Sequence, residues 1–373
     1  MTAQAHSELA ARPAPPLWRS LIRLARPTQW SKSVFVLVGP FYGARDLMAA
    51  GRTMEGIIIP ALLAAAAFAM VSSGCYVIND IFDRVADRSH PRKARRPIAA
   101  GYISVPQAWT FAIVLFALAA AFTTSIAFAF PDGGGSALKV GAMLGLYAVN
   151  VFCYSARLKH HIIADVISLA LGFVIRVLAG CFAIGIEPTV WLLNVTFFLS
   201  MFLAFGKRLG ERRTLDGRDT PPTPAASSAS PAVVSLETGS PRAVSGAALH
   251  RRVQARYTDT LLQIAVVVCA AITLMTYALY VQDQSQKLHV GYKLWLTVLP
   301  LTYGLFRCIV LLEEGEYDDP TEIAVHDRGM QFAAVLFLAV TIALVVLHRG
   351  APSPATPPPG DPPVQAVTLP AGA

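Results

Sequence analysis

Nine apolar runs, each close to the length that crosses a lipid bilayer, constrain the fold of this chain more than any other feature. A transmembrane helix needs about 20 predominantly apolar residues, and helices surrounded by lipid and other helices are apolar on every face. Charged residues make up only 14% of the chain, against roughly 25% in soluble proteins. We therefore predict an all-α bundle of nine membrane-spanning helices, over residues 31–49, 56–78, 106–130, 138–155, 162–184, 189–206, 257–281, 291–312 and 330–348.

The basic residues between these runs predict the orientation of the bundle. With a cytoplasmic N-terminus, 23 of the 31 Lys and Arg residues lie on the cytoplasmic side, 6 on the opposite side and 2 within spans. Cytoplasmic loops of membrane proteins carry an excess of Lys and Arg, so the bias predicts that the N-terminus is inside. The same bias explains the net charge of +8 without nucleic acid as a partner.

Three segments have compositions that cannot bury enough apolar area to fold. Residues 1–17, 216–248 and 350–373 are rich in Pro, Ala or Ser, and we predict disorder in all three. The first contains no apolar stretch of the kind found in signal peptides, so the first span is expected to be retained. The predicted membrane domain is therefore 18–349, interrupted by a cytoplasmic insertion at 216–248. The five cysteines have no metal-ligand spacing, and we interpret them as packing residues.

Residues 79–88, at the end of the second run, concentrate carboxylates at a predicted membrane boundary. Asn79, Asp83 and Asp87 are four residues apart and Asp80 precedes Asp83 by three, so on one helix they would lie on or near one face. Ionisable groups at membrane depth usually mark functional sites. Mg²⁺ takes one or two carboxylates together with water and phosphate oxygens. We predict that these four residues bind Mg²⁺; the alternative is a solvated acidic helix end balanced by arginines.

Basic and polar clusters gather on the same predicted cytoplasmic side, as an enzyme at a membrane surface requires. Arg and Lys side chains can share phosphate charge with a metal ion, or they can contact lipid headgroups. Asp165 and Arg176 are eleven residues apart and share one helix face, so they should point inward to helix partners or to substrate. The candidate substrate-binding residues are Lys32, Arg92, Lys93, Tyr154, Lys159, Arg176, Lys207, Arg208 and Glu211.

Taken together, these motifs resemble the UbiA superfamily of intramembrane prenyltransferases, and most closely its decaprenyl-phosphate phosphoribosyltransferase branch. The acidic motif alone identifies only the superfamily. The segments that resemble the branch occur in order from residue 26 to about 330: RPTQWSK at 26–32, NDIFDRVADRSHPRKARRPIAAG at 79–101, YSARLKH at 154–160, GKRLGER at 206–212 and PTEIAVHDR at 320–328. Aromatic prenyltransferases of the superfamily carry a second aspartate-rich motif after the sixth helix. Here that position holds basic residues with only Glu211, which fits the phosphoribosyl branch.

The resemblance implies an enzyme of a bacterial inner membrane whose active site faces the cytoplasm. Phosphoribosyl diphosphate bound with Mg²⁺ would donate 5-phosphoribose to a polyprenyl phosphate and release pyrophosphate. Asp80, Asp83 and Asp87 would be catalytic, because Mg²⁺ bound there would neutralise the leaving group. The candidates for the 5-phosphate and the lipid phosphate are Lys32, Lys159, Lys207 and Arg208.

Two other functions stay open at this point. One is transfer of a polyprenyl group from its diphosphate to an aromatic acceptor, against which the basic segment around Lys207 argues. The other is a lipid-phosphate transporter with Asp165 and Arg176 as a relay, although polar groups gather on one side and no paired broken helices stand out. The length and saturation of the lipid, the downstream pathway and the oligomeric state, including a homo-oligomer in the membrane, are not determined by the sequence.

Overall fold

The computed structural model describes residues 15–89, 93–130, 133–219, 258–288, 291–314, 317, 323 and 326–347. Within these residues the chain is helical and contains no strand, which confirms the all-α class. The elements are α2 (Leu17–Ala25), η1 (Pro27–Leu37), α3 (Val38–Ala49), α4 (Glu55–Phe82), α5 (Arg84–Arg88), η2 (Lys93–Arg95), α6 (Val105–Ile126), α7 (Gly133–Ala156), η3 (Leu158–His160), α8 (Ala164–Ala183), α9 (Val190–Asp219), α11 (Asp259–Leu288), η4 (Gly291–Thr297), α12 (Val298–Glu314) and α14 (Arg328–Leu347). Most of the three segments predicted to be disordered lies outside the described residues, although α2 begins at Leu17 and α9 continues to Asp219.

Seven of the predicted spans correspond to helices that are long and apolar enough to cross a membrane, among the residues that the structure describes. The last predicted span corresponds to α14, of which Arg328–Leu344 is counted as a shorter apolar helix. The first, 31–49, is not one α-helix, because η1 gives way to α3 at Val38. Pro40 has no N–H to bond the carbonyl of Val36, so an unbroken α-helical ladder cannot run through this point. The count of nine spans and the side on which the termini lie stay predictions.

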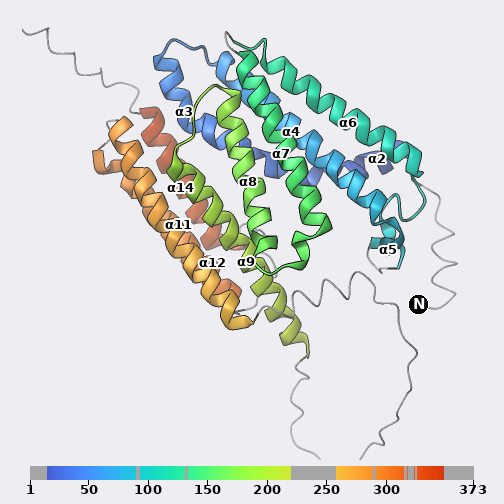
Figure 1. Cartoon of the computed structure of the whole chain (residues 1–373). Helices are drawn as coiled ribbons and strands as arrows, with labels where there is room; N and C mark the ends of the chain where they lie inside the picture. The colour runs from blue at the N-terminus through green and yellow to red at the C-terminus, as the bar shows by residue number, and fades with distance from the viewer. Residues whose placement is uncertain are drawn as a thin grey trace, which may run out of the picture.

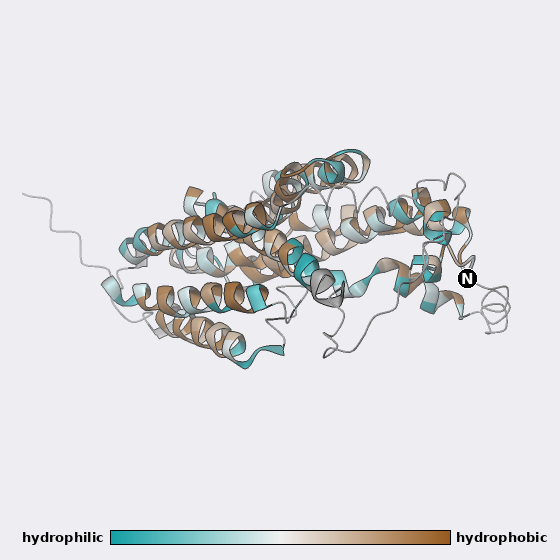
Figure 2. Cartoon of the chain, turned by 90° about the horizontal axis from the view of Figure 1, so that it is seen from below, coloured by the Kyte–Doolittle hydropathy of each residue, from teal (hydrophilic) through white to brown (hydrophobic). Residues whose placement is uncertain are grey.

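The helices pack into two groups that meet at α8 and α9 (Figure 1). One core is built by α4, α6, α7 and α8 around Phe68, Tyr147 and Ile175. The other is built mainly by α9, α11 and α12 around Phe202 and Leu262. The long helices are mostly apolar, whereas hydrophilic residues gather at helix ends and connecting segments (Figure 2). This distribution is the one expected of an integral membrane protein.

The length of α4 explains why the acidic motif lies at its end. The 28 residues of this helix span about 42 Å, more than the roughly 30 Å of a bilayer core. Its last turn therefore extends beyond the hydrocarbon when its first turns lie at the opposite boundary. The helix ends at Phe82, Asp83 is its C-cap, and the short α5 follows.

Close contact between η1 and α8 fixes the segment that carries Lys32. A Cβ atom at Gly180 would collide with the backbone carbonyl of Val36 and press on Pro40. We expect Gly180→Ala to lower the free energy of unfolding by about 2–3 kcal/mol, because backbone cannot yield as a flexible side chain does. Thermal unfolding in detergent measures this change. The matched control is Gly145→Ala on α7, where an added Cβ meets no atom within 4 Å; equal unfolding midpoints for the two variants would contradict the prediction.

Candidate functional site

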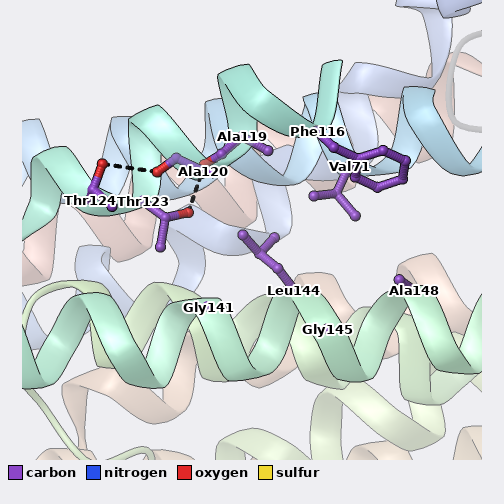
Figure 3. Close-up of a pocket in the computed structure, with 10 residues that line it drawn as sticks. All are labelled: Val71, Phe116, Ala119, Ala120, Thr123, Thr124, Gly141, Leu144, Gly145 and Ala148. Carbon is purple, nitrogen blue, oxygen red and sulfur yellow. Dashed lines mark hydrogen bonds between the residues drawn. The ribbon is translucent and has the colours of Figure 1, made fainter. Parts of the chain in front are cut away.

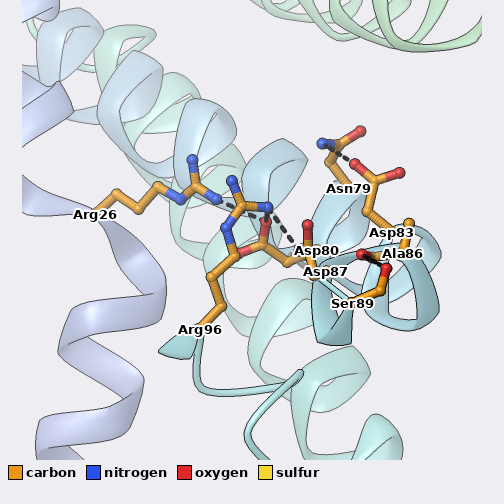
Figure 4. Close-up of polar contacts among 8 residues, drawn as sticks. All are labelled: Arg26, Asn79, Asp80, Asp83, Ala86, Asp87, Ser89 and Arg96. Carbon is orange, nitrogen blue, oxygen red and sulfur yellow. Dashed lines mark hydrogen bonds and ion pairs between the residues drawn. The ribbon is translucent and has the colours of Figure 1, made fainter. Parts of the chain in front are cut away.

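The acidic motif divides into two pairs that point in different directions (Figure 4). In the first pair, Asp80 accepts hydrogen bonds from Arg26 Nη2 at 2.6 Å and from Arg96 Nη1 at 3.0 Å. Asp87 accepts from the same Arg96 nitrogen at 2.7 Å. In the second pair, Asn79 Nδ2 donates to Asp83 Oδ2 at 3.1 Å. The structure therefore places Asp87 with Asp80, and does not bring all four side chains onto one face.

The Asp80 pair is an ion-pair cluster, and it is buried. Asp80 and Asp87 are only 2% and 3% exposed, so these two are not solvated, but arginines do balance them, as the alternative to a metal site supposes. The positive charge that two adjacent carboxylates require comes from Arg26 and Arg96. Sequence reasoning did not select either arginine. Arg26 also stacks over the Tyr76 ring, with 4.8 Å from its Cζ to the ring centroid, so α2 is held firmly against α4.

Asn79, the residue that donates to Asp83, lines a polar cavity of about 180 Å³ between η1, α4, α7 and α8. Four of the sequence-predicted residues line this cavity: Lys32, Asn79, Tyr154 and Arg176. They come from four separate elements, so the fold brings together residues that are up to 144 positions apart. The other lining residues are Tyr76, Tyr147, Asn150, Val151, Ser155, Ser168, Leu169, Gly172 and Phe173.

Several of these lining residues are polar groups inside apolar spans that sequence reasoning passed over. Ser168 Oγ donates to Asn150 Oδ1, and Asn150 Nδ2 donates to the Ser168 carbonyl, both at 2.9 Å. This reciprocal pair joins α7 to α8 beside the cavity. An uncharged polar residue inside an apolar span is a weak sign of a binding site, because many such side chains only hydrogen-bond to the backbone of their own helix. The sequence therefore shows that these residues lie within spans, but it does not show that they meet at one cavity.

The remaining predicted substrate residues do not line the cavity. Arg208 forms an ion pair with Asp165, which links α9 to α8, so the inward-facing Asp165 has a helix partner. Glu211 lies near Tyr154, which lines the cavity and lies beside this pair. Lys159 lies in η3, and Lys93 and Lys207 are exposed. Arg92 lies outside the described residues.

Arg176 is the most buried cation of the cavity, at 5% exposure. Its Nη1 donates to the Gly172 carbonyl at 2.8 Å, and its Nη2 donates to Tyr147 Oη at 3.0 Å and to Ser72 Oγ at 3.3 Å. The rings of Tyr147, Phe68 and Phe173 lie 4.5, 5.6 and 5.6 Å from its Cζ. Neutral groups thus surround a charge that the bilayer region makes costly to bury.

A second, apolar cavity of about 340 Å³ lies between α4, α6 and α7 (Figure 3). Phe116, Val71 and Leu144 line it together with small residues. The hydroxyls of Thr123 and Thr124 donate to carbonyls of their own helix at 2.8 and 3.0 Å, so they offer no free donor. Such a lining suits hydrocarbon.

The Asn79–Asp83 pair suits the metal that the sequence predicts. An amide oxygen and a carboxylate are hard oxygen ligands, and Mg²⁺ uses one or two carboxylates while keeping positions for water and phosphate. Asp80 and Asp87 are already engaged by arginines. Among the described residues, no group of three or more His, Cys, Asp or Glu is arranged to hold a metal ion. Within the motif, Asn79 lines the cavity and Asp83 is the carboxylate that is hydrogen-bonded to it.

Comparisons with known proteins support the sequence interpretation. Residues 37–214 match the UbiA prenyltransferase family. The chain is 30% identical over 332 residues to a decaprenyl-phosphate phosphoribosyltransferase of Corynebacterium glutamicum, covering 88% of this chain and 87% of that protein. It is 27% identical over 342 residues to the enzyme of the same name from Mycobacterium tuberculosis, covering 91% and 98%. A UbiA homologue from Archaeoglobus fulgidus, solved with GPP and Mg²⁺, superposes with a TM-score of 0.56 at 18% identity over 87% of this chain and 99% of its own.

Proposed function

The chain belongs to the UbiA prenyltransferase family, and we propose that it transfers 5-phosphoribose from phosphoribosyl diphosphate to a polyprenyl phosphate. The observation that carries this proposal is the 30% identity, over nearly the whole of both chains, to a decaprenyl-phosphate phosphoribosyltransferase. The cavity supports it, because Lys32 and Arg176 provide two cations for a reaction in which both substrates carry phosphate groups. The excess of Lys and Arg on one side supports an active site that faces the cytoplasm of a bacterial cell.

In this proposal Asn79 and Asp83 would hold Mg²⁺, and the diphosphate of the donor would bind next to them. When bound, Mg²⁺ supplies charge neutralisation for the departing pyrophosphate. Asp80 and Asp87 act through Arg96 and Arg26, which they hold beside the motif. These arginines keep the end of α4 fixed against α2 and add positive potential near the leaving group.

The reaction breaks the bond between the anomeric carbon and the diphosphate oxygen, and forms a bond from that carbon to a lipid phosphate oxygen. The ribose centre becomes oxocarbenium-like, as in other glycosyl transfers. The lipid phosphate is already ionised at neutral pH, so the cavity needs no strong general base. Lys32, exposed on η1 and lining the cavity, is placed to bind this phosphate while the isoprenoid tail stays in the membrane.

The test uses the purified full chain in detergent with radiolabelled phosphoribosyl diphosphate and a polyprenyl phosphate. We expect label to enter the organic phase only when Mg²⁺ is present, with one pyrophosphate released for each label transferred. A parallel reaction supplies a polyprenyl diphosphate and an aromatic acceptor. Prenylation of the acceptor without phosphoribosyl transfer would replace this proposal by the usual reaction of the family.

The transporter alternative loses its structural basis in the described residues. Asp165 is engaged by Arg208, whereas Arg176 lies in the cavity, eleven residues and about 16 Å further along α8. The two side chains therefore form no relay with each other. Flux of a lipid phosphate across proteoliposomes without Mg²⁺ would revive that function.

A further inference from the structure

We propose that Arg176 and Tyr147, which Ser72 holds in place by hydrogen bonds, form the site that binds a phosphate monoester in the polar cavity, and that this group is the 5-phosphate of the ribosyl donor. The assignment of this phosphate to the donor rests on the proposed function. The site itself rests on the geometry around Arg176. It differs from the sequence prediction, in which Lys32, Lys159, Lys207 and Arg208 were the candidates for this phosphate.

The first argument is the charge of Arg176. Arg176 contacts a carbonyl, two hydroxyls and three aromatic rings, and no carboxylate among the described residues pairs with it. Contacts with ring faces compensate only part of the cost of burying a guanidinium. By contrast, the half-buried Arg208 on α9 pairs with the carboxylate of Asp165. A cation left with neutral partners in a cavity is expected to bind an anion.

The second argument counts hydrogen-bond donors. Arg176 Nε is buried and has no acceptor. Ser72 Oγ donates to Tyr147 Oη at 3.1 Å, and both hydroxyls accept from Arg176 Nη2. The hydroxyl proton of Tyr147 then has no acceptor among the described residues. Arg176 and Tyr147 both line the cavity, so unsatisfied donors converge where an acceptor-rich group would fit.

The third argument is position along α4. Ser72 and Asn79 are seven residues apart on this helix, which is about 10 Å. A donor whose diphosphate lies at Asn79 and Asp83 therefore reaches Arg176 with a group at its opposite end. In phosphoribosyl diphosphate the ribose lies between the diphosphate and one phosphate monoester, the 5-phosphate. Lys32 then remains for the phosphate of the lipid.

The kinetic test compares two donors at saturating polyprenyl phosphate: phosphoribosyl diphosphate and ribosyl 1-diphosphate, which lacks the 5-phosphate. We expect Arg176→Gln to reduce the preference for the phosphorylated donor roughly 10- to 100-fold, because a charged hydrogen-bond partner is lost. The KM for polyprenyl phosphate should stay unchanged. Tyr147→Phe should reduce the preference by a smaller factor, and Arg23→Gln, at an exposed arginine of α2, should leave it unchanged.

Other kinetic results would overturn the assignment. A raised KM for polyprenyl phosphate with an unchanged donor preference would assign the phosphate to the lipid. An equal loss of activity with both donors would mean that Arg176 only supports the fold.

A binding measurement separates the site from the reaction. Ribose 5-phosphate is titrated into the full chain in detergent, with and without the Arg176→Gln substitution, and pyrophosphate with Mg²⁺ is the control ligand. We expect binding of ribose 5-phosphate to weaken at least about tenfold in Arg176→Gln while pyrophosphate binding is retained. This result would hold even if no phosphoribosyl transfer were found, in which case the proposed function fails and the phosphate site stands. Equal binding of ribose 5-phosphate by both proteins would overturn the site.

Discussion

Replacing Asp83 with Asn is expected to reduce turnover at least about 100-fold while leaving the thermal unfolding midpoint unchanged. Asp83 accepts a hydrogen bond at 3.1 Å from Asn79, which lines the cavity. An Asn at this position keeps the size of the side chain but removes the negative charge that would hold Mg²⁺ against the leaving group. The loss should therefore appear in catalysis and in the Mg²⁺ concentration needed for half-maximal rate.

Two measurements separate a loss of catalysis from a loss of the fold. Initial rates over a range of Mg²⁺ concentrations show the catalytic effect, and thermal unfolding in detergent shows whether the fold is retained. Asp46→Asn is the matched control, because Asp46 is exposed on α3 and has no place in the proposed site. Wild-type turnover in Asp83→Asn, with the same dependence on Mg²⁺, would contradict the proposal that Asp83 binds the metal.

Replacing Asp80 with Asn is expected to act on stability, with a loss of about 2–3 kcal/mol in the free energy of unfolding. Asp80 is buried and accepts hydrogen bonds from both Arg26 and Arg96. The substitution leaves these two cations close together with Asp87 as the remaining carboxylate. The side chains of Arg26 and Arg96 are 28% and 26% exposed, so water screens part of their charge. We therefore expect less than the 3–5 kcal/mol typical of a fully buried broken pair.

A double-mutant cycle tests the origin of that loss. Combining Asp80→Asn with Arg26→Gln should cost less than the sum of the two single substitutions, because the second change removes the cation that the first leaves without its carboxylate, whereas Arg96 keeps Asp87. Unfolding midpoints of the four proteins in one detergent supply the comparison. Strict additivity, or an unchanged midpoint in Asp80→Asn, would mean that the ion-pair cluster contributes nothing to the fold.

These two predictions differ because the structure divides a motif that looks uniform in the sequence. The spacing of Asn79, Asp83 and Asp87 predicts one face of one helix, but α4 ends at Phe82 and α5 begins at Arg84. The cations that draw Asp80 and Asp87 away come from Arg26, 54 residues earlier, and from Arg96, 9 to 16 residues later. A local pattern cannot reveal partners that tertiary packing supplies.

The sequence predicted the all-α class well because long apolar runs have few other solutions in a membrane. It was less successful for the first span, where the missing N–H of Pro40 interrupts the α-helical ladder between η1 and α3. A single charge inside an apolar run is a strong signal, and Arg176 was found in this way. For a basic residue in a loop, the sequence does not predict the direction of the side chain. Of the lysines predicted to contact substrate, Lys32 lines the cavity, whereas Lys93, Lys159 and Lys207 do not.

The most direct test of the account is an experimental structure of the full chain with Mg²⁺ and phosphoribosyl diphosphate bound. We expect the diphosphate and the metal beside Asn79 and Asp83, the ribose in the polar cavity, and the 5-phosphate against Arg176. A donor bound outside this cavity would contradict the account, as would a cavity that excludes the ribosyl donor and instead binds a polyprenyl diphosphate.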